Sequence, residues 1–256
     1  MQQLQTPYVS YQVLNKVGTI EFFTPQHNSM PADILTQLAV TIEKAGADQH
    51  STVLILKTAG DKTFCAGASF DELLLIQNEE EGLIFFSGFA KVINAMRKCP
   101  KFIIGRIQGK AIGGGVGLAA GCDYTYATTE ASIKLSELAV GIGPFVVAPV
   151  IERKIGKSAT YELAIDATNF RSAEWAKEKG LYTQIYSSIH LMDQAIEKIT
   201  FTLSASSTKA MSEIKKVFWQ GTENWDQLLF DRAAISGKLI VTDEAKSYLT
   251  AFKKWK

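Results

Sequence analysis

The sequence predicts an α/β protein, and three observations support this fold class. Short β-type runs at residues 8–14 and 17–23 open the chain. Residues 30–45 then place apolar side chains at helical spacing, and residues 52–58, TVLILKT, form a continuous β-branched and leucine run. Such a run is typical of a strand that is buried on both faces. The alternation of strands and helices indicates layered α/β architecture.

The first two runs are separated only by Asn15 and Lys16, a connection of the length found in β-hairpins. The helical pattern at 30–45 contains Pro31 near its start. Proline suits a first helical turn, because the N–H that it lacks would have no partner inside the helix. We therefore expect the chain to open with a hairpin, then a helix, then a buried strand.

The alternation continues along the chain. We expect strands at 101–108 and 124–128, and helices at 82–98, 113–121, 158–166 and 172–180. The turn at Thr168 and Asn169 joins the last two helices. After about residue 190 the pattern is helical to the end, so we divide the chain into a core at 1–190 and a C-terminal helical region at 191–256.

The C-terminal region contains more aromatic residues than solvated terminal helices need. These residues are Phe218, Trp219, Trp225, Phe230, Tyr248, Phe252 and Trp255. Two interpretations stay open. The region is either a helical cap on the body of its own chain or an interface between subunits.

Composition excludes several classes of function. The net charge is +1, from 27 basic and 26 acidic residues, which gives no basic field for nucleic acid and no membrane-binding patch. The three cysteines are widely spaced without a CxxC pair, and the three histidines have no metal-ligand spacing. The start of the chain lacks the features of a signal peptide. We expect a cytoplasmic protein with no metal, whose partners are small molecules or further copies of itself.

Residues 109–123, GKAIGGGVGLAAGCD, carry the most informative pattern. Gly113, Gly114 and Gly115 lack a Cβ, so a ligand can approach the backbone closely and φ can be positive at little cost. The helix expected after them would direct unpaired N–H groups and the positive end of its dipole at this ligand. The segment therefore predicts a backbone site for a negatively charged oxygen.

A second segment of the same kind, KTFCAGASFDEL, spans residues 62–73. Small residues at 66–68 leave N–H groups accessible, and Ser69 with Glu72 has the pattern of a capping box. Two such N–H groups that converge on one oxygen form an oxyanion hole, where each donor contributes about 3–4 kcal/mol to transition-state stabilisation. Taken singly, either segment is better explained by ordinary packing at a strand–helix turn.

Glu137 stands among apolar neighbours in SIKLSELAVGIGPF. A buried carboxylate is costly unless it is paired or functional, and burial would raise its pKa toward the range useful for proton transfer. The alternative is a glutamate on the exposed face of a short element. A dinucleotide site is a further alternative, since Gly115, Gly117 and Ala120 fit a relaxed GxGxxA pattern. However, the run at 124–128 has no acidic residue at its end, where a ribose would be bound.

The three motifs FCAGASFDEL, GKAIGGGVGLAAGCD and LSELAVGIGPF, at these separations, resemble the crotonase (enoyl-CoA hydratase/isomerase) superfamily. The resemblance extends from the N-terminal hairpin through the C-terminal helices. It implies a crotonase-like spiral of β-β-α turns with a C-terminal helical trimerisation region. It also implies a homotrimer or a dimer of trimers.

The resemblance further implies an acyl-CoA thioester substrate, with coenzyme A as part of the substrate and no separate cofactor. By position, the N–H groups of Ala68 and Gly114 would hold the thioester oxygen. The remaining positions of the CoA ester site would be Ala66, Gly67 and Gly113, with Lys62 or the C-terminal Lys253, Lys254 and Lys256 at the CoA phosphates.

Hydratases of this superfamily carry two glutamates, whose positions here are Gly117 and Glu137. A single carboxylate suffices to move a proton between two carbons, so the sequence favours double-bond isomerisation. Ser69 and Ser136 replace the family's usual aspartate and proline. We also expect an acyl pocket that contains Gly117, Pro144 and Phe145.

Three alternatives to isomerisation remain. The glycine context of the second motif and the Gly-Pro-Phe at 143–145 are similar to methylglutaconyl-type hydratases. The oxyanion hole would also serve a thioester decarboxylase or hydrolase. Finally, the missing glutamate would fit a non-catalytic binding member of the fold.

Overall fold

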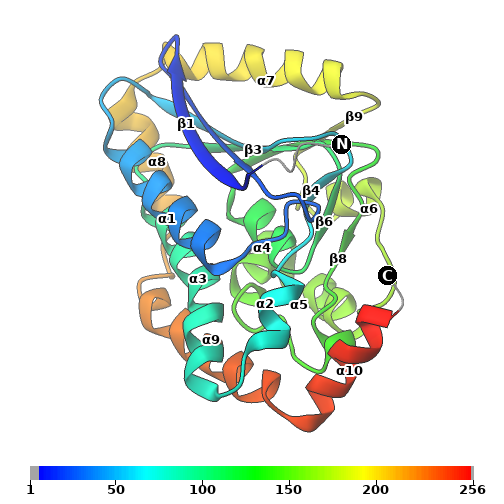
Figure 1. Ribbon diagram of the computed structural model, residues 1–256. Helices are drawn as coiled ribbons and strands as arrows, with labels where there is room; N and C mark the ends of the chain where they lie inside the picture. Colours follow the sequence, from blue (N-terminus) through cyan, green and yellow to red (C-terminus); the bar gives the residue numbers. More distant parts are fainter. Residues whose placement is uncertain (1–5, 255–256) are drawn as a thin grey trace.

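A computed structural model describes residues 6–254 of the chain, which fold around two sheets (Figure 1). The larger sheet has the order β1-β2-β3-β5-β7-β9, and the smaller has the order β4-β6-β8. The strands are β1 (Tyr8–Leu14), β2 (Val17–Phe23), β3 (Val53–Thr58), β4 (Thr63–Cys65), β5 (Ile103–Ile107), β6 (Lys110–Ile112), β7 (Tyr124–Thr128), β8 (Ile133–Lys134) and β9 (Gln184–Tyr186). All pairings are parallel except the β1–β2 hairpin.

Helices pack around these sheets and fill most of the C-terminal part. They are α1 (Ala32–Ala47), α2 (Phe70–Leu75), α3 (Glu79–Lys98), α4 (Gly114–Gly121), the short 3₁₀ helix η1 (Leu138–Val140), α5 (Ala148–Ile165), α6 (Ala173–Glu178), α7 (Ile189–Ser204), α8 (Thr208–Phe218), α9 (Trp225–Ile240) and α10 (Asp243–Lys254). No helix within residues 6–254 is both long and apolar enough to span a bilayer.

The predicted hairpin is confirmed. Tyr8 pairs with Phe23 at its open end and Leu14 with Val17 at its closed end. The connecting residues Asn15 and Lys16 have φ values of 51° and 63°, the left-handed conformation that two-residue hairpin turns require.

Three successive segments of the chain repeat one arrangement, with a strand in each sheet followed by a helix. β3 and β4 lead to α2 and α3, β5 and β6 lead to α4, and β7 and β8 lead to η1 and α5. The predicted spiral of β-β-α turns is therefore confirmed. The strands of the small sheet are only two or three residues long, which is too short to give a periodic signal in the sequence.

The larger sheet has a core on each face. On one face, residues such as Ile20 and Leu54 belong to a core that also contains buried side chains of α1, α3, α4 and α9. On the other face, Met192 and Ile196 of α7 cover Val53 and Ile104. Figure 1 shows α7 lying across this second face, at the top of the view. Burial on both faces explains the continuous apolar run in β3.

Some element boundaries differ from the prediction. Pro31 is the N-cap of α1 rather than part of its first turn. The predicted capping box is wrong in one half: Ser69 Oγ accepts from the Glu72 N–H at 3.4 Å, but the Glu72 carboxylate accepts from the Ala32 N–H at 2.8 Å. It therefore caps α1. The helix expected at 158–166 is the second half of α5, which breaks at Gly156, where φ is +78°.

The C-terminal helices cap their own chain. α9 packs closely on α3, since a Cβ on Gly82 would lie 2.7 Å from the Cα of Gly237. Trp219 and Trp225 are buried and in edge-to-face contact, with ring centroids 6.0 Å apart. Other aromatic side chains of this region are not fully covered by the described residues, and Phe218 is 63% exposed. Phe230 and Tyr248 are also partly exposed. Trp255 and the side chain of Phe252 lie outside the described residues.

Candidate active site

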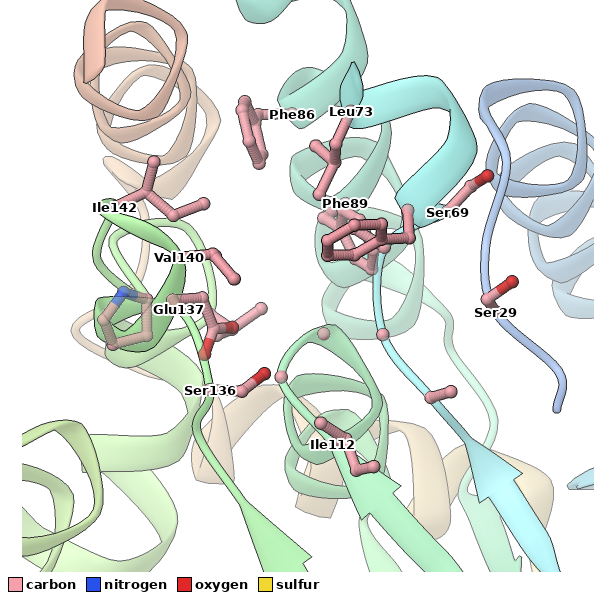
Figure 2. Close-up of a pocket in the computed structure, with 18 of the residues that line it drawn as sticks. Ser29, Ser69, Leu73, Phe86, Phe89, Ile112, Ser136, Glu137, Val140 and Ile142 are labelled. Atoms are coloured by element: carbon pink, nitrogen blue, oxygen red, sulfur yellow. The ribbon is translucent and has the colours of Figure 1, made fainter. Parts of the chain in front are cut away.

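One cavity of about 650 Å³ collects most of the residues that the sequence singles out. Its lining comes from the loops after β4, β6 and β8, from the segment before α1, and from α2, α3 and α9. Figure 2 shows Glu137 on one wall, Phe86 and Leu73 across the cavity, and Ser69 and Ser29 on the remaining side. The small sheet therefore delivers three separate chain segments to one site.

Two of these segments lie in contact. Gly67 precedes Ala68 with a φ of +85°, and Gly113 precedes Gly114 with a φ of +53°, values that glycine adopts at little cost. A Cβ on Gly67 would lie 2.8 Å from the carbonyl oxygen of Ile112 and 3.4 Å from the nitrogen of Gly114. Among residues 6–254, no hydrogen-bond acceptor meets the N–H of Ala68 or of Gly114. Two free donors thus lie close together in the lining.

Gly114 is also the first residue of α4. Its N–H is one of those that a helix leaves unpaired at its positive end. Phe89 packs directly beneath it, so that a Cβ on Gly114 would lie 2.2 Å from Phe89 Cε1. Glycine is therefore required here by space. The helix start and its free N–H provide the backbone environment for a negatively charged oxygen that the sequence predicts.

Glu137 immediately precedes η1, and its carbonyl oxygen accepts from the N–H groups of Val140 and Ile142, both at 3.1 Å. Its carboxylate lies beside Gly113, where a Cβ would be 3.0 Å from Glu137 Oε1. The other oxygen, Oε2, is buried and has no hydrogen-bond partner among the described residues. Burial raises the pKa of Glu137 to about 7. Such a carboxyl group can take up or release a proton near neutral pH.

The rest of the cavity wall is mainly apolar. Pro144 and Phe145, which the sequence places in an acyl pocket, both line it. Further apolar side chains of the wall are Leu73, Phe86, Phe89, Val140, Ile142, Val146 and Val147. The smaller residues Ala66, Gly67 and Gly113 are also in the lining. A mainly apolar cavity with a small number of polar groups is typical of small-molecule sites.

The expectation that Gly117 lines the acyl pocket is wrong. Gly117 is buried in α4 and does not reach the cavity. Val147, from the segment that leads into α5, occupies the adjacent space, and a Cβ on Gly117 would lie 2.5 Å from Val147 Cγ1. The position where hydratases carry a glutamate is therefore filled by a valine side chain.

Of the predicted lysines, only Lys62 has a described side chain, and it does not reach the cavity. Lys62 is exposed beside the start of β4 and is not part of the lining. The side chains of Lys253 and Lys254 are not described, and Lys256 lies outside the described residues. The cavity wall instead contains Lys134, whose Nζ lies 4.5 Å from the centroid of the Phe170 ring.

The parts of the lining that sequence reasoning missed include Lys134 and the connection between β2 and α1. Lys134 shares the Phe170 ring with Lys110, whose Nζ lies 5.2 Å from the centroid. Burial, with the neighbouring charge of Lys110, lowers the pKa of Lys134. Gln26 and His27, in the connection between β2 and α1, also line the cavity. The only signal for either part was position, since Lys134 belongs to β8 and Gln26 and His27 lie shortly before the Met30–Ala68 bridge.

The described residues thus bring together two kinds of group. Free N–H donors next to Gly67 and Gly113 suit an oxygen that gains negative charge. A carboxyl group with a pKa near 7 suits proton transfer to or from a nearby carbon. Together they fit chemistry in which a carbonyl compound passes through an enolate.

Comparison with known proteins gives a consistent result. Residues 12–254 match the family model described as enoyl-CoA hydratase/isomerase. The short-chain-enoyl-CoA hydratase of Clostridium acetobutylicum is 27% identical over 246 residues, which cover 94% of this chain and 93% of the relative. The peroxisomal Delta(3,5)-Delta(2,4)-dienoyl-CoA isomerase of Arabidopsis thaliana is 27% identical over 244 residues, which cover 89% of this chain and 86% of the relative.

The fold is also found among solved structures. The crystal structure of an enoyl-CoA hydratase from Bacillus halodurans superimposes with a TM-score of 0.89 at 22% identity, covering 95% of this chain and 99% of that one. That likeness establishes the crotonase fold, and the family match extends over nearly the whole chain. The match over residues 12–254 shows that the protein belongs to the enoyl-CoA hydratase/isomerase family.

Proposed function

We propose that the protein is an enoyl-CoA isomerase that moves a carbon–carbon double bond through a thioester enolate. The N–H groups of Ala68 and Gly114 hold the thioester oxygen, and Glu137 moves the proton. The observation that carries this proposal is the carboxylate of Glu137. It lies beside Gly113, next to those two donors, and burial raises its pKa to about 7.

The reaction needs one acid/base group and no water. In a 3-enoyl-CoA, the Glu137 carboxylate takes a proton from C2, and the electrons of that C–H bond delocalise over C1 to C4 as a dienolate. The two backbone N–H groups stabilise the charge that develops on the thioester oxygen. The protonated Glu137 then returns a proton to C4, which leaves the double bond between C2 and C3. The mass of the substrate is unchanged.

The acidic side chains of the cavity favour isomerisation over hydration. Glu137 is one of two carboxylates in the described lining. The other, Asp71, is exposed in the first turn of α2. The position of a second catalytic glutamate is Gly117, and Val147 fills the space beside it. A single buried carboxylate is therefore available for proton transfer.

The test uses Glu137→Gln, which keeps the shape of the side chain and removes the ionisable carboxyl group. We expect conversion of 3-hexenoyl-CoA to 2-hexenoyl-CoA to fall by about 10²–10⁴-fold. Binding of the ester, measured by calorimetry, should change little. Asp71→Asn is the matched control and should retain most of the activity. Undiminished turnover by Glu137→Gln would overturn the assignment.

Hydration of a 2-enoyl-CoA, including a branched methylglutaconyl ester, is the second candidate. It is favoured by the similarity to the Clostridium acetobutylicum protein named as a hydratase, over 93% of that protein's length. Mass spectrometry separates the two activities, because hydration adds one water to the product and isomerisation adds nothing. The same mass spectra would reveal a thioester decarboxylase, whose product has lost carbon dioxide, or a hydrolase, which releases free CoA.

A non-catalytic binding role predicts a different result. In that case acyl-CoA esters would either leave the protein unchanged or bind without turnover. A ligand at a hundred times its Kd stabilises a protein by about 2.7 kcal/mol, which is readily seen as a rise in Tm. We expect both the rise in Tm and turnover.

We further propose that Ala66, Gly67 and Gly113 lie along the CoA ester and that Lys134 and Lys110 meet its phosphates. Lys134 is in the lining, and neither lysine forms an ion pair with a carboxylate within residues 6–254. Lys134→Ala should weaken CoA binding several-fold, whereas Lys62→Ala should not. Assembly as a trimer or a dimer of trimers is also proposed, and light scattering after size-exclusion chromatography measures it.

A further inference from the structure

The connection between β2 and α1 is held in an unusual conformation. His27 and Asn28 both have a φ of 56°, which places two consecutive non-glycine residues in the left-handed region. Asparagine adopts this conformation more readily than most residues, but two together carry strain. Such strain persists only where the surroundings fix it. The structure shows what fixes it here.

The side chain of Asn28 makes three hydrogen bonds and is 4% exposed. Its Oδ1 accepts from the Thr24 N–H at 3.1 Å. Its amide nitrogen donates to the carbonyl oxygens of Ala59 at 2.9 Å and Thr63 at 3.0 Å. Thr24 Oγ1 in turn donates to the Ser29 carbonyl oxygen at 2.7 Å. Asn28 therefore ties its own loop to the two ends of the β3–β4 connection.

The backbone of this loop clamps the segment that contains Ala68. On one side, the Ala66 N–H donates to the His27 carbonyl oxygen at 3.2 Å. On the other side, the Met30 N–H donates to the Gly67 carbonyl oxygen at 2.8 Å, and the Ser69 N–H donates to the Met30 carbonyl oxygen at 3.0 Å.

These bonds engage the backbone before and after Ala68 and leave its own N–H free. Met30 and Ala68 form an isolated parallel bridge. The direction of the Ala68 N–H is thus set by bonds on both sides of it.

We infer that Asn28 is a positioning residue for the reaction: by fixing the left-handed loop that clamps residues 66–69, it aims the N–H of Ala68 at the thioester oxygen. This inference rests on the proposed function. Asn28 does not line the cavity and touches no substrate. Its effect reaches the substrate through backbone hydrogen bonds alone.

The inference predicts a specific kinetic pattern. Asn28→Ala removes the three side-chain bonds and lets the loop relax, which moves the Ala68 N–H away from the oxygen. A donor displaced by about 1 Å costs on the order of 10²-fold in rate, so we expect kcat for 3-hexenoyl-CoA to fall about 10- to 100-fold. The Kd for the ester should change by less than about threefold, because most of the cavity wall is untouched.

The direct readout is the carbonyl stretching frequency of bound crotonyl-CoA labelled with ¹³C at C1. A hydrogen bond from the Ala68 N–H polarises the C=O bond and lowers this frequency. In wild-type protein we expect a clear downward shift on binding, and in Asn28→Ala a smaller one. The matched control is Asn94→Ala, which removes another buried asparagine outside the cavity. It should leave both the shift and kcat unchanged.

The outcomes are distinguishable. If wild type shows neither a carbonyl shift nor turnover, the proposed function fails, and the inference fails with it. If wild type shows both and Asn28→Ala keeps them, the inference alone is overturned. Should Asn28→Ala not fold, Thr24→Val removes another tie of the same loop, the bond to Ser29, and is expected to give a smaller loss of kcat and shift. An unchanged Thr24→Val variant would then overturn the inference.

Discussion

Val147 Cγ1 occupies the space into which a side chain at position 117 would extend, since a Cβ on Gly117 would lie 2.5 Å from it. Position 117 therefore has no room for a glutamate side chain while Val147 keeps its place. A carboxylate cannot be restored here by one substitution without displacing the valine.

Gly117→Glu alone should destabilise the protein and give no hydratase activity. Overpacking of this kind costs about 1–3 kcal/mol. In Gly117→Glu/Val147→Ala, the smaller side chain makes room, and we expect much of that stability to return together with hydration of crotonyl-CoA. Urea unfolding and product mass measure the two effects. Val147→Ala alone is the control, and hydration by the control would show that the second carboxylate is not needed.

The activity should depend on the ionisation of Glu137. The first step needs the carboxylate, which forms as the pH rises through a pKa of about 7. We expect kcat/KM for 3-hexenoyl-CoA to increase about tenfold per pH unit below pH 7 and to level off above it. A profile that is flat between pH 5 and 8 would contradict the role of Glu137 as base.

Stability should change with pH in the opposite direction. Burial raises the folded-state pKa of Glu137 to about 7 from an ordinary value of 4.5, so between these values the folded protein holds a proton that the unfolded chain has released. The free energy of unfolding contributed by this group therefore falls as the pH rises from 4.5 to 7. Glu137→Gln should remove this slope and exceed wild type in urea midpoint at pH 8. If the urea midpoints of wild type and Glu137→Gln changed in parallel with pH, this prediction would be contradicted.

Asp123 should be a strong determinant of stability. Its carboxylate pairs with Lys215 at 2.8 Å and accepts from Trp219 Nε1 at 3.0 Å, and the Lys215 side chain is only 2% exposed. Asp123→Ala leaves that ammonium group buried without its partner, which costs about 3–5 kcal/mol.

The control for Asp123 is the exposed pair of Lys216 and Glu213, whose side chains are 66% and 68% exposed. Glu213→Ala should lower the free energy of unfolding by no more than about 1 kcal/mol. Denaturant unfolding compares the two variants. Equal losses in the free energy of unfolding would show that burial of the Asp123–Lys215 pair does not explain the effect of Asp123→Ala.

The sequence predicted the parts of the fold that carry a local signal. The hairpin at Asn15 and Lys16 has a distinctive turn, and the buried run of β3 is long enough to recognise. The strands of the small sheet have no periodicity to detect, and they were expected only through the resemblance to a family. Glu72 was assigned to its own helix because a sequence does not show that Ala32 lies beside it.

The same limit applies to the site. The small-residue loops and Glu137 stand out by composition, and they do line one cavity. That Val147 fills the space beside Gly117 depends on contact between distant segments, so the position was predicted as part of the pocket. No local sequence pattern marks Asn28, because its role lies in three hydrogen bonds to residues elsewhere in the chain.

The parallel pairing of β4 with β6 has a consequence for how this site can change. Neighbouring strands stand about 4.8 Å apart. Two nitrogens that each donate to one oxygen over about 2.9 Å, at a wide angle, are separated by nearly the same length. The proposed donors follow β4 and β6 in the chain, so the pairing of these two strands brings them close together. Replacing the acid or a side chain of the cavity wall would leave this strand pairing in place.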